Sequence, residues 1–310
     1  MAEEETIRRE VRNEVGLKKR VKGVLGQPKG RWAVLSRLTG AAVRAILVAI
    51  LIATPSIVLP HTHSDANQIV ALISIFAAIL VMIEYASVYP SLIEFRDAPP
   101  FNRIRYVSLM LMVFLLSQIM AVSGNPSTLA EFTYAVGTVI GMAMDFPYSP
   151  VRLFVLAVPD GATIEQISLV RTAAGLCYLI SLVSLAVFLI IIRMGRWPSR
   201  GASFNVWVNL PTFDPTAGGD VVDRLTRDSR LNVILGFLLP FVIPAAMQTA
   251  SSLFDSFTFA SPQTMIWTIS AWSFLPASLF MRGIAMARIA AMIAEKRQFL
   301  TAQQDGLVLA

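Results

Sequence analysis

Few side chains in this sequence could do chemistry, and they are widely separated. Two histidines and an aspartate alternate in one turn, as His61, His63 and Asp65, and the sequence contains no other histidine. Two imidazoles and a carboxylate can ligate a divalent cation, but a closed structural zinc site needs four ligands. We therefore expect no bound metal, and these three residues are the candidates should one be present.

Ionisable residues in or beside apolar stretches form a second group of candidates. A charge in hydrocarbon costs several kcal/mol unless it is paired or hydrated, so each such residue has either a partner or a function. Glu84 and Arg44 fall near the same end of two neighbouring apolar stretches, so they can form an interhelical pair. Such a pair at a membrane boundary is most simply structural.

Two further arginines, Arg152 and Arg171, flank an irregular apolar region. Each can pair with a nearby acid, or it can contact an anionic lipid or substrate. The acids within reach in sequence are Glu131, Asp145, Asp160 and Glu165. Structural pairing is the simpler interpretation, and it predicts a small charge-paired platform.

Uncharged residues inside the apolar stretches offer weaker chemistry. Gln118 and Gln248 can hydrogen-bond to neighbouring helices. Pro240 and Pro244 are four residues apart and should kink their helix. The backbone carbonyls that they leave without helical partners resemble those that bind ions in transporters, although a packing kink is the simpler explanation.

Enzyme motifs are missing from the sequence. It contains no G-x-S-x-G, no Walker A, no G-x-G-x-x-G and no H-E-x-x-H pattern. The single cysteine, Cys177, lies in an apolar stretch and can form no intramolecular disulfide. Gly137 and Gly141 form a G-x-x-x-G motif that permits close helix approach. We expect a protein that is not an enzyme and has no cofactor.

The composition places these residues in a membrane protein. The 310 residues are 55% hydrophobic and only 15% charged, with a mean hydropathy of +0.63. An ordinary soluble domain is about 25% charged. The net charge of +6 lies beside apolar stretches and not on a basic, aromatic-rich face, so we expect membrane lipids as partners and no nucleic acid.

Six apolar stretches are long enough to cross a bilayer, and the basic residues orient them. The expected spans are about 45–60, 68–88, 106–123, 173–192, 231–250 and 264–282. If both termini are cytoplasmic, all 26 basic residues except Arg152 and Arg171 fall on the cytoplasmic side. We therefore predict an all-α integral protein of a cell membrane, such as a prokaryotic inner membrane.

The segment 129–158 does not fit this pattern. One ordinary crossing there would reverse every later span and place six arginines outside, against the charge rule. A re-entrant hairpin, an interfacial segment and two short crossings remain, and Pro147 and Pro150 favour the first two. Capping boxes at Thr128/Glu131 and Thr163/Gln166 predict helix starts on either side of the segment.

Charged segments flank and interrupt the membrane region, which covers 45–193 and 231–282. Residues 1–44 contain a basic amphipathic segment, and 283–310 a C-terminal helix and tail. The loop 194–230 alternates like a short strand from Phe204 to Leu210 and then forms a charged helix with acid–base pairs four residues apart.

Two kinds of function fit these expectations. The segments 1–44, 194–230 and 283–310 offer a cytoplasmic docking face, so we favour a non-enzymatic accessory, assembly or scaffold component of a membrane complex. The alternative is a small transporter or channel that uses 129–158 and the Pro240/Pro244 break. A lipid-acting enzyme at Arg152 and Arg171 is a third reading, for which the sequence offers no nucleophile.

Overall fold

The computed structural model describes residues 29–59, 64–124, 126–159, 161–194, 197–198, 204–214, 216–253 and 261–308. Within these ranges every regular element is a helix. The helices are α2 (Lys29–Val58), α3 (Ser64–Ala86), α4 (Phe101–Ala121), α5 (Thr128–Met144), α6 (Pro150–Leu156), α7 (Ile164–Met194), α8 (Val206–Asn209), α9 (Val221–Leu253) and α10 (Pro262–Val308). The amphipathic segment predicted within 1–44 lies outside the described residues up to residue 28.

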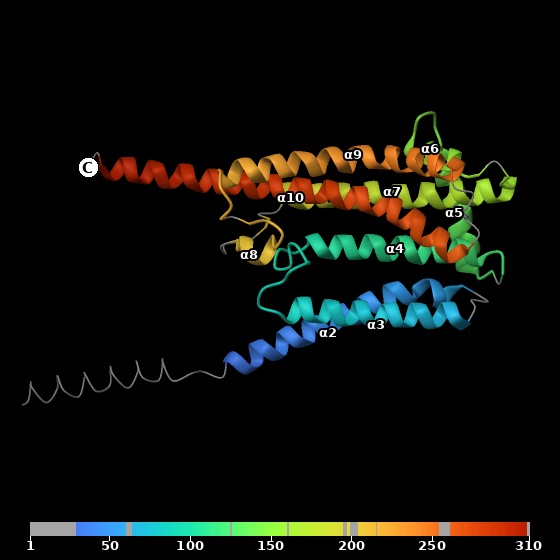
Figure 1. Ribbon diagram of the computed structural model, residues 1–310, viewed down its shortest axis with the longest axis horizontal. Coiled ribbons are helices and arrows are strands. Elements are labelled where there is room, and N and C mark those ends of the chain that lie inside the picture. The colour runs from blue at the N-terminus through green and yellow to red at the C-terminus, as the bar shows by residue number, and fades with distance from the viewer. Residues whose placement is uncertain are drawn as a thin grey trace, which may run out of the picture.

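Six of the described helices, α2, α3, α4, α7, α9 and α10, are long and apolar enough to cross a membrane. They run alternately up and down the bundle, so α2 begins and α10 ends at the same end of it (Figure 1). We call this the basic end, because it holds Arg44, Arg105 and Arg282, and we call the opposite end the platform end. The all-α, six-span membrane architecture predicted from the sequence is confirmed.

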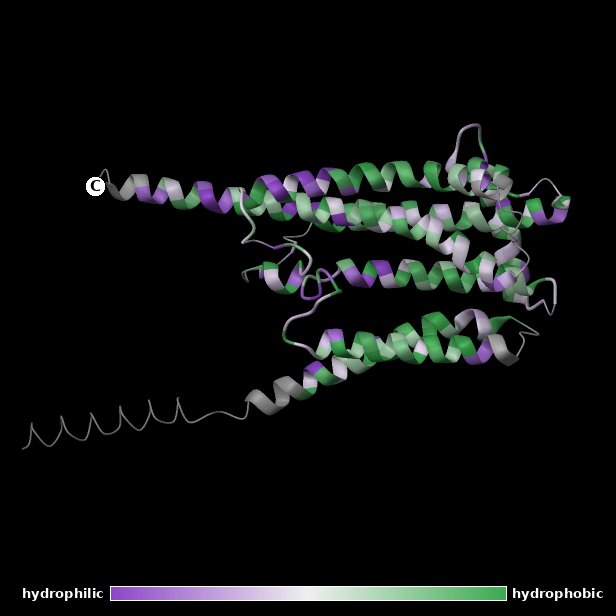
Figure 2. Ribbon diagram, viewed as in Figure 1, coloured by the Kyte–Doolittle hydropathy of each residue, from purple (hydrophilic) through white to green (hydrophobic). Residues whose placement is uncertain are grey.

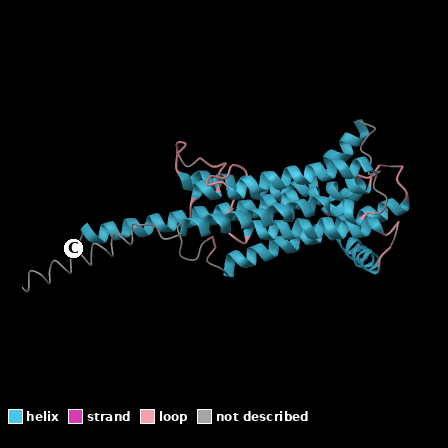
Figure 3. Cartoon of the chain, turned by 90° about the horizontal axis from the view of Figure 1, so that it is seen from below, coloured by secondary structure: helices cyan, strands magenta, loops and turns pink. Residues whose placement is uncertain are grey.

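Hydropathy follows this division. Apolar residues cover the middle of the bundle, while hydrophilic residues gather where α4, α9 and α10 reach the basic end (Figure 2). The apolar part of α2 begins at Leu35, ten residues earlier than predicted. Helix α10 continues past the other helices as a single helix, as Figures 1 and 3 both show.

The irregular segment forms a platform at one end of the bundle. Helix α5 lies across the platform end of the spans and neither crosses nor re-enters the bundle (Figures 1 and 3). Its 17 residues reach only about 26 Å, short of the roughly 30 Å hydrocarbon core. Its buried residues are small and recur every three or four positions, at Ala130, Thr133, Gly137 and Gly141. This stripe faces α4 and α7.

Two local predictions change and one is confirmed. Helix α5 is capped by Ser127, whose hydroxyl accepts from the Ala130 N–H at 3.2 Å, one residue before the predicted cap at Thr128. The capping box of Thr163 and Gln166 forms in both directions, at 2.9 and 3.2 Å. The strand predicted at 204–210 is wrong, because Val206–Asn209 form one helical turn capped by the Asn205 side chain.

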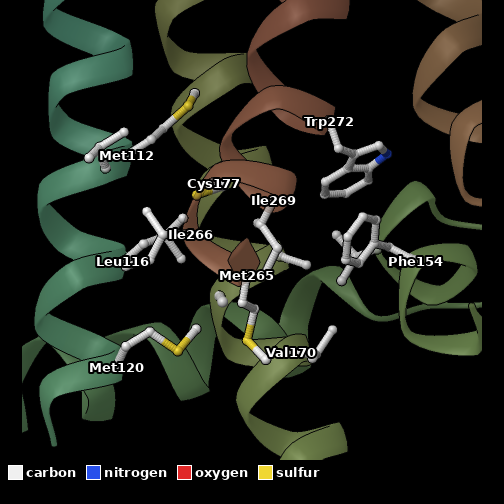
Figure 4. Packing of buried hydrophobic residues seen from close by; sticks show 14 of the residues in the cluster. Met112, Leu116, Met120, Phe154, Val170, Cys177, Met265, Ile266, Ile269 and Trp272 are labelled. Atoms are coloured by element: carbon white, nitrogen blue, oxygen red, sulfur yellow. The ribbon is translucent and has the colours of Figure 1, made fainter. Parts of the chain in front are cut away.

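Two apolar clusters hold the helices together. The cluster nearer the platform end joins α4, α6, α7 and α10, and Phe154 packs against Trp272 with ring centroids 4.5 Å apart (Figure 4). The other lies at the basic end, where Phe95, Phe101 and Phe188 pack together with Trp197. Cys177 is fully buried in the first cluster.

The α2–α3 hairpin is attached to the rest of the bundle along one edge only. Among the described helices α3 contacts α2 alone, and α2 contacts α4 and touches α10. Tyr106 of α4 donates a hydrogen bond to the Leu47 carbonyl at 2.9 Å, and Gln263 of α10 donates to Ser56 at 3.1 Å. This limited contact leaves space between the hairpin and the other helices at the basic end.

Candidate functional site

A large cavity fills that space. Its volume is about 1270 Å³, and it is lined by α2, α3, the segment 92–94, α4, α9 and α10. Its wall is mainly apolar, whereas its charged groups all lie towards the basic end. The charged residues are Arg44, Glu94, Arg103, Arg105 and Arg282.

Among the described residues of the lining the only acid is Glu94, and it is already paired. The Arg282 guanidinium donates from Nε and Nη2 to the two Glu94 carboxylate oxygens, at 2.5 and 2.7 Å. The third nitrogen of Arg282 donates to the Asn232 side chain at 3.0 Å, and Thr212 donates to Glu94 at 2.7 Å. A bidentate pair with these further hydrogen bonds is a strong contact that directs Glu94 at Arg282. The negative charge of Glu94 also acts on Arg105, but it is one charge among four arginines.

Arg105, the fifth residue of α4, lines the cavity. Its guanidinium lies over the rings of Phe101 and Phe274, at 5.2 and 5.8 Å from their centroids. Its closest hydrogen bond is a long one, 3.4 Å to the Asn102 side chain, and its Nε is buried with no hydrogen-bond partner among the described residues. A buried charge of this kind is costly without an anion beside it.

Arg44 and Arg103 add two more positive charges without carboxylate partners in the described part of the chain. Arg44 donates a hydrogen bond to the Gly40 backbone carbonyl at 2.7 Å, and its guanidinium lies 4.6 Å from the centroid of the Tyr85 ring. Arg103 is exposed on the first turn of α4. The basic end of the cavity therefore carries an excess of positive charge.

The predicted Arg44–Glu84 pair does not form. Instead, the Glu84 carboxylate accepts hydrogen bonds from the backbone of Ser91, Leu92 and Ile93 and from the Ser91 hydroxyl. Arg96 closes the same turn from the other side, because it donates to the carbonyls of Glu84 and Ser87 at 3.1 and 2.7 Å. Glu84 thus fixes the segment that carries Glu94.

The segment 204–213 packs against this segment and covers the basic end. The Phe95 N–H donates to the Asn209 carbonyl at 2.6 Å, and the Asp97 N–H donates to the Asn209 side chain at 2.9 Å. Phe95 has a φ of 52°, which is rare for a bulky residue, and its ring is fully buried in the basic-end cluster. These contacts hold the neighbouring Glu94 in place.

The platform end contains a second charged group, in which sequence-predicted residues meet. Arg152 of α6 and Arg171 of α7 each place Nε beside one oxygen of Asp145, at 2.8 and 2.7 Å. The Asp145 side chain is only 5% exposed, against 39% and 31% for the two arginines. The contacts are ionic and poorly aligned, since Asp145 Oδ1 and Arg171 Nε lack hydrogen-bond partners among the described residues.

The predicted charge-paired platform is therefore present, centred on Asp145. Asp145 follows the last residue of α5, so its contacts tie α5 to α6 and α7. Of the other acids proposed as partners, Glu131 is exposed in the first turn of α5. The G-x-x-x-G motif acts at the same junction, because a Cβ on Gly175 of α7 would lie 2.5 Å from the Gly141 Cα.

The proline pair lies in a helix that stays continuous. Helix α9 runs through Pro240 and Pro244 from Val221 to Leu253. Because Pro244 has no N–H, the Pro240 carbonyl loses its helical partner, and the Trp272 indole N–H donates to it at 3.0 Å. This carbonyl is engaged in helix packing and is not directed at an ion site.

The remaining predicted residues contribute little to either site. Gln118 is buried in α4, and the expected hydrogen bond to another helix is not seen in the described structure. Gln248 lies exposed near the end of α9. His61 and His63, and the side chain of Asp65, lie outside what the structure describes, and the described residues contain no cluster of three metal-ligating side chains.

The charged helix at the start of α9 does not form its predicted pairs four residues apart. Asp220 instead accepts hydrogen bonds from the Val222 N–H and from Arg297 of α10, each at 2.6 Å. The hydrogen bond from Arg297 chiefly lowers the pKa of Asp220, and the one from Val222 adds to the shift. The Arg224 guanidinium instead lies over the Phe213 ring, 4.7 Å from its centroid.

Sequence reasoning missed Glu94, Arg105 and Arg282 as members of one site. All three were visible only as charges at the boundaries of apolar stretches, and no spacing in the sequence links them. The comparisons add no relative to guide the assignment. The chain matches no protein-family model, no curated protein and no solved structure.

Proposed function

We propose that this protein is a non-enzymatic accessory or scaffold component of a membrane complex. The observation that supports the proposal is the end of α10, residues 295–308, which we call the α10 extension. It projects beyond the bundle at the basic end, and its side chains at 295–304 are all exposed (Figures 1 and 3). A short helix without tertiary contacts is marginally stable in water, so contact with a partner would stabilise it.

The pattern of the extension fits helix pairing. Phe299 and Leu300 are adjacent large apolar residues, 62% and 48% exposed. Leu300 follows Ile293, which packs against the basic-end cluster, at an interval of seven residues, the repeat of a helix that packs along another helix. Both hydrophobic exposure and spacing therefore favour a helical partner on this side.

The transporter or channel alternative has less support. It relied on a re-entrant segment at 129–158 and on a broken helix at Pro240 and Pro244. Helix α5 lies across the end of the bundle, and α9 is continuous through both prolines. What remains in its favour is the cavity at the basic end.

The test is purification from native membranes in a mild detergent, with the mass of the complex measured by light scattering. The proposal predicts a stoichiometric partner that is lost from the variant Phe299→Glu/Leu300→Glu, because two charges replace the apolar contact. The matched control, Gln298→Glu/Thr301→Glu, adds the same charge to the opposite side of the helix and should keep the partner. A protein that purifies alone, and whose reconstituted vesicles pass solute, would sink the proposal.

A further inference from the structure

We infer that the basic-end cavity binds one anionic phospholipid from the leaflet at that end. Its phosphate lies among Arg44, Arg103 and Arg105, and its acyl chains lie along the apolar wall. This inference is independent of the docking proposal, because it concerns other residues at another place. Three features of the cavity support it, namely its charge, its depth and its opening towards the bilayer.

The charge of the lining requires an anion. Four arginines and one glutamate line the cavity, and the glutamate is held by Arg282 in a bidentate pair. Three arginines therefore remain without a carboxylate among the described residues. Guanidinium groups are well suited to phosphate, because their N–H donors form a planar fork that matches its oxygens.

Arg105 has donors to spare for such a ligand. Two aromatic rings hold its guanidinium, its contact with Asn102 is 3.4 Å long, and its Nε is buried and unpartnered. In a bilayer this arrangement is unfavourable until an anion arrives. A headgroup phosphate in the cavity would accept hydrogen bonds from the terminal nitrogens of Arg105, whose contact with Asn102 is 3.4 Å long.

The depth of the apolar wall matches one leaflet. Arg282 lies at the charged end of the lining, and Asn232 of α9, whose side chain accepts a hydrogen bond from Arg282, lies at the same level. Ile243, further along α9, also lines the cavity and lies 11 residues beyond Asn232, about 16 Å along a helix. Half of the roughly 30 Å hydrocarbon core is about the same distance, so the wall reaches the middle of the membrane.

Access from the bilayer follows from the loose attachment of the α2–α3 hairpin. Leu47 of α2 and Leu275 of α10 both line the cavity and remain 38% and 52% exposed. The volume of about 1270 Å³ is above the roughly 300–1,000 Å³ of common small-molecule sites. An apolar wall that opens towards hydrocarbon suits acyl chains, whereas a free phosphate would leave most of it uncovered.

Native mass spectrometry of the full-length protein tests the inference. The protein is reconstituted with equal amounts of phosphatidylglycerol and phosphatidylcholine, extracted in a mild detergent, and the retained lipid is identified. We expect one phosphatidylglycerol per chain. Its retention should fall about tenfold in Arg105→Gln, which removes charge-assisted hydrogen bonds, and should recover in part in Arg105→Lys.

Matched variants separate the site from general charge and size effects. Arg103→Gln should weaken retention, whereas Arg230→Gln, an exposed arginine of α9 outside the cavity, should not. Leu275→Trp should displace the acyl chains, while Leu238→Trp, at a position 45% exposed on α9 and outside the lining, should leave the lipid in place. These exposed positions keep the test informative even if Arg105→Gln fails to fold.

Three results would overturn the inference. Equal retention of the two lipids would show that the arginines select no headgroup. Displacement of the lipid by millimolar inorganic phosphate would assign the arginines to a free anion. A second copy of the chain or another protein in place of the lipid would assign the cavity to a protein contact.

Discussion

At Asp145 one buried carboxylate is shared by two arginines from different helices. Because these helices start or end at the platform, the shared carboxylate fixes their relative positions. Each arginine is about one-third exposed, so water screens part of the charge. Loss of the carboxylate should therefore cost more stability than loss of either arginine, because the aspartate is nearly inaccessible to water.

Replacing this carboxylate should destabilise the protein. We expect Asp145→Asn to lower the free energy of unfolding by about 2 kcal/mol, below the roughly 3–5 kcal/mol of a fully buried broken pair, because the arginines can still be hydrated. Thermal or denaturant unfolding in detergent measures the change. Glu131→Gln, an exposed acid of the same α5 helix, is the control and should change little. Equal stability of the two variants would contradict a structural role for Asp145.

Single residues also show how far the sequence could be read. The two arginines that broke the charge asymmetry were expected to find an acid, and Asp145 was among the candidates. Glu84 was assigned to Arg44, yet it binds three backbone N–H groups in the turn that follows its own helix. A sequence shows which charges need partners, but turn geometry decides whether backbone or side chain supplies them.

Between elements, α5 and α7 cross with their backbones in close contact. The two backbones meet at Gly141 and Gly175, where an added Cβ would lie within 3 Å of backbone atoms of the other helix. Backbone cannot move aside as a flexible side chain can, so both positions require glycine.

A methyl group at this crossing should separate the helices. We expect Gly175→Ala to cost about 1–3 kcal/mol, the usual range for overpacking, and to weaken the Asp145 contacts by shifting α5. Gly40→Ala is the matched helical control, because its Cβ would meet only the flexible end of the Arg44 side chain. Unfolding of both variants in detergent measures the difference. If Gly175→Ala were as stable as Gly40→Ala, the close crossing would be wrong.

Element boundaries were predictable where local chemistry alone sets them. Thr163 and Gln166 cap α7 as expected, because their reciprocal hydrogen bonds need no distant partner. The alternating apolar residues at 204–210 were misread as a strand. Leu210 and Phe213 instead pack into the basic-end cluster around a single helical turn, and the seven residues 204–210 are too few to distinguish the two periods.

For the whole molecule, the two ends of the bundle differ in charge. In the described part of the chain, all basic residues except Arg152 and Arg171 belong to segments at the basic end. The positive-inside rule therefore predicts a cytoplasmic basic end and an external platform.

Thiol labelling of intact cells tests this orientation. The native Cys177 is fully buried, so an added cysteine should carry the signal. We expect Gly161→Cys, next to the platform, to react with an impermeant reagent from outside, and Gly218→Cys, near the basic end, to react only after lysis. No atom lies within 4 Å of a Cβ built at either position, so both variants should fold. The reverse pattern would contradict the orientation.

The number of spans and their alternation were predictable, because apolar length and flanking charge are local quantities. The cavity was not predictable. It depends on how far the α2–α3 hairpin stands from α4, α9 and α10. That distance is set by contacts between residues far apart in the sequence, such as Ser56 and Gln263, which are 207 positions apart.

The one-sided attachment of this hairpin has a mechanical consequence. The platform joins α4, α5, α6 and α7 into a frame, and the hairpin has no contact with α5 or α6 among the described helices. Lateral pressure in the bilayer would therefore move the hairpin relative to the frame. This movement would change the width of the cavity before it disturbed the frame. The width of the cavity should therefore depend on the tension and the thickness of the membrane.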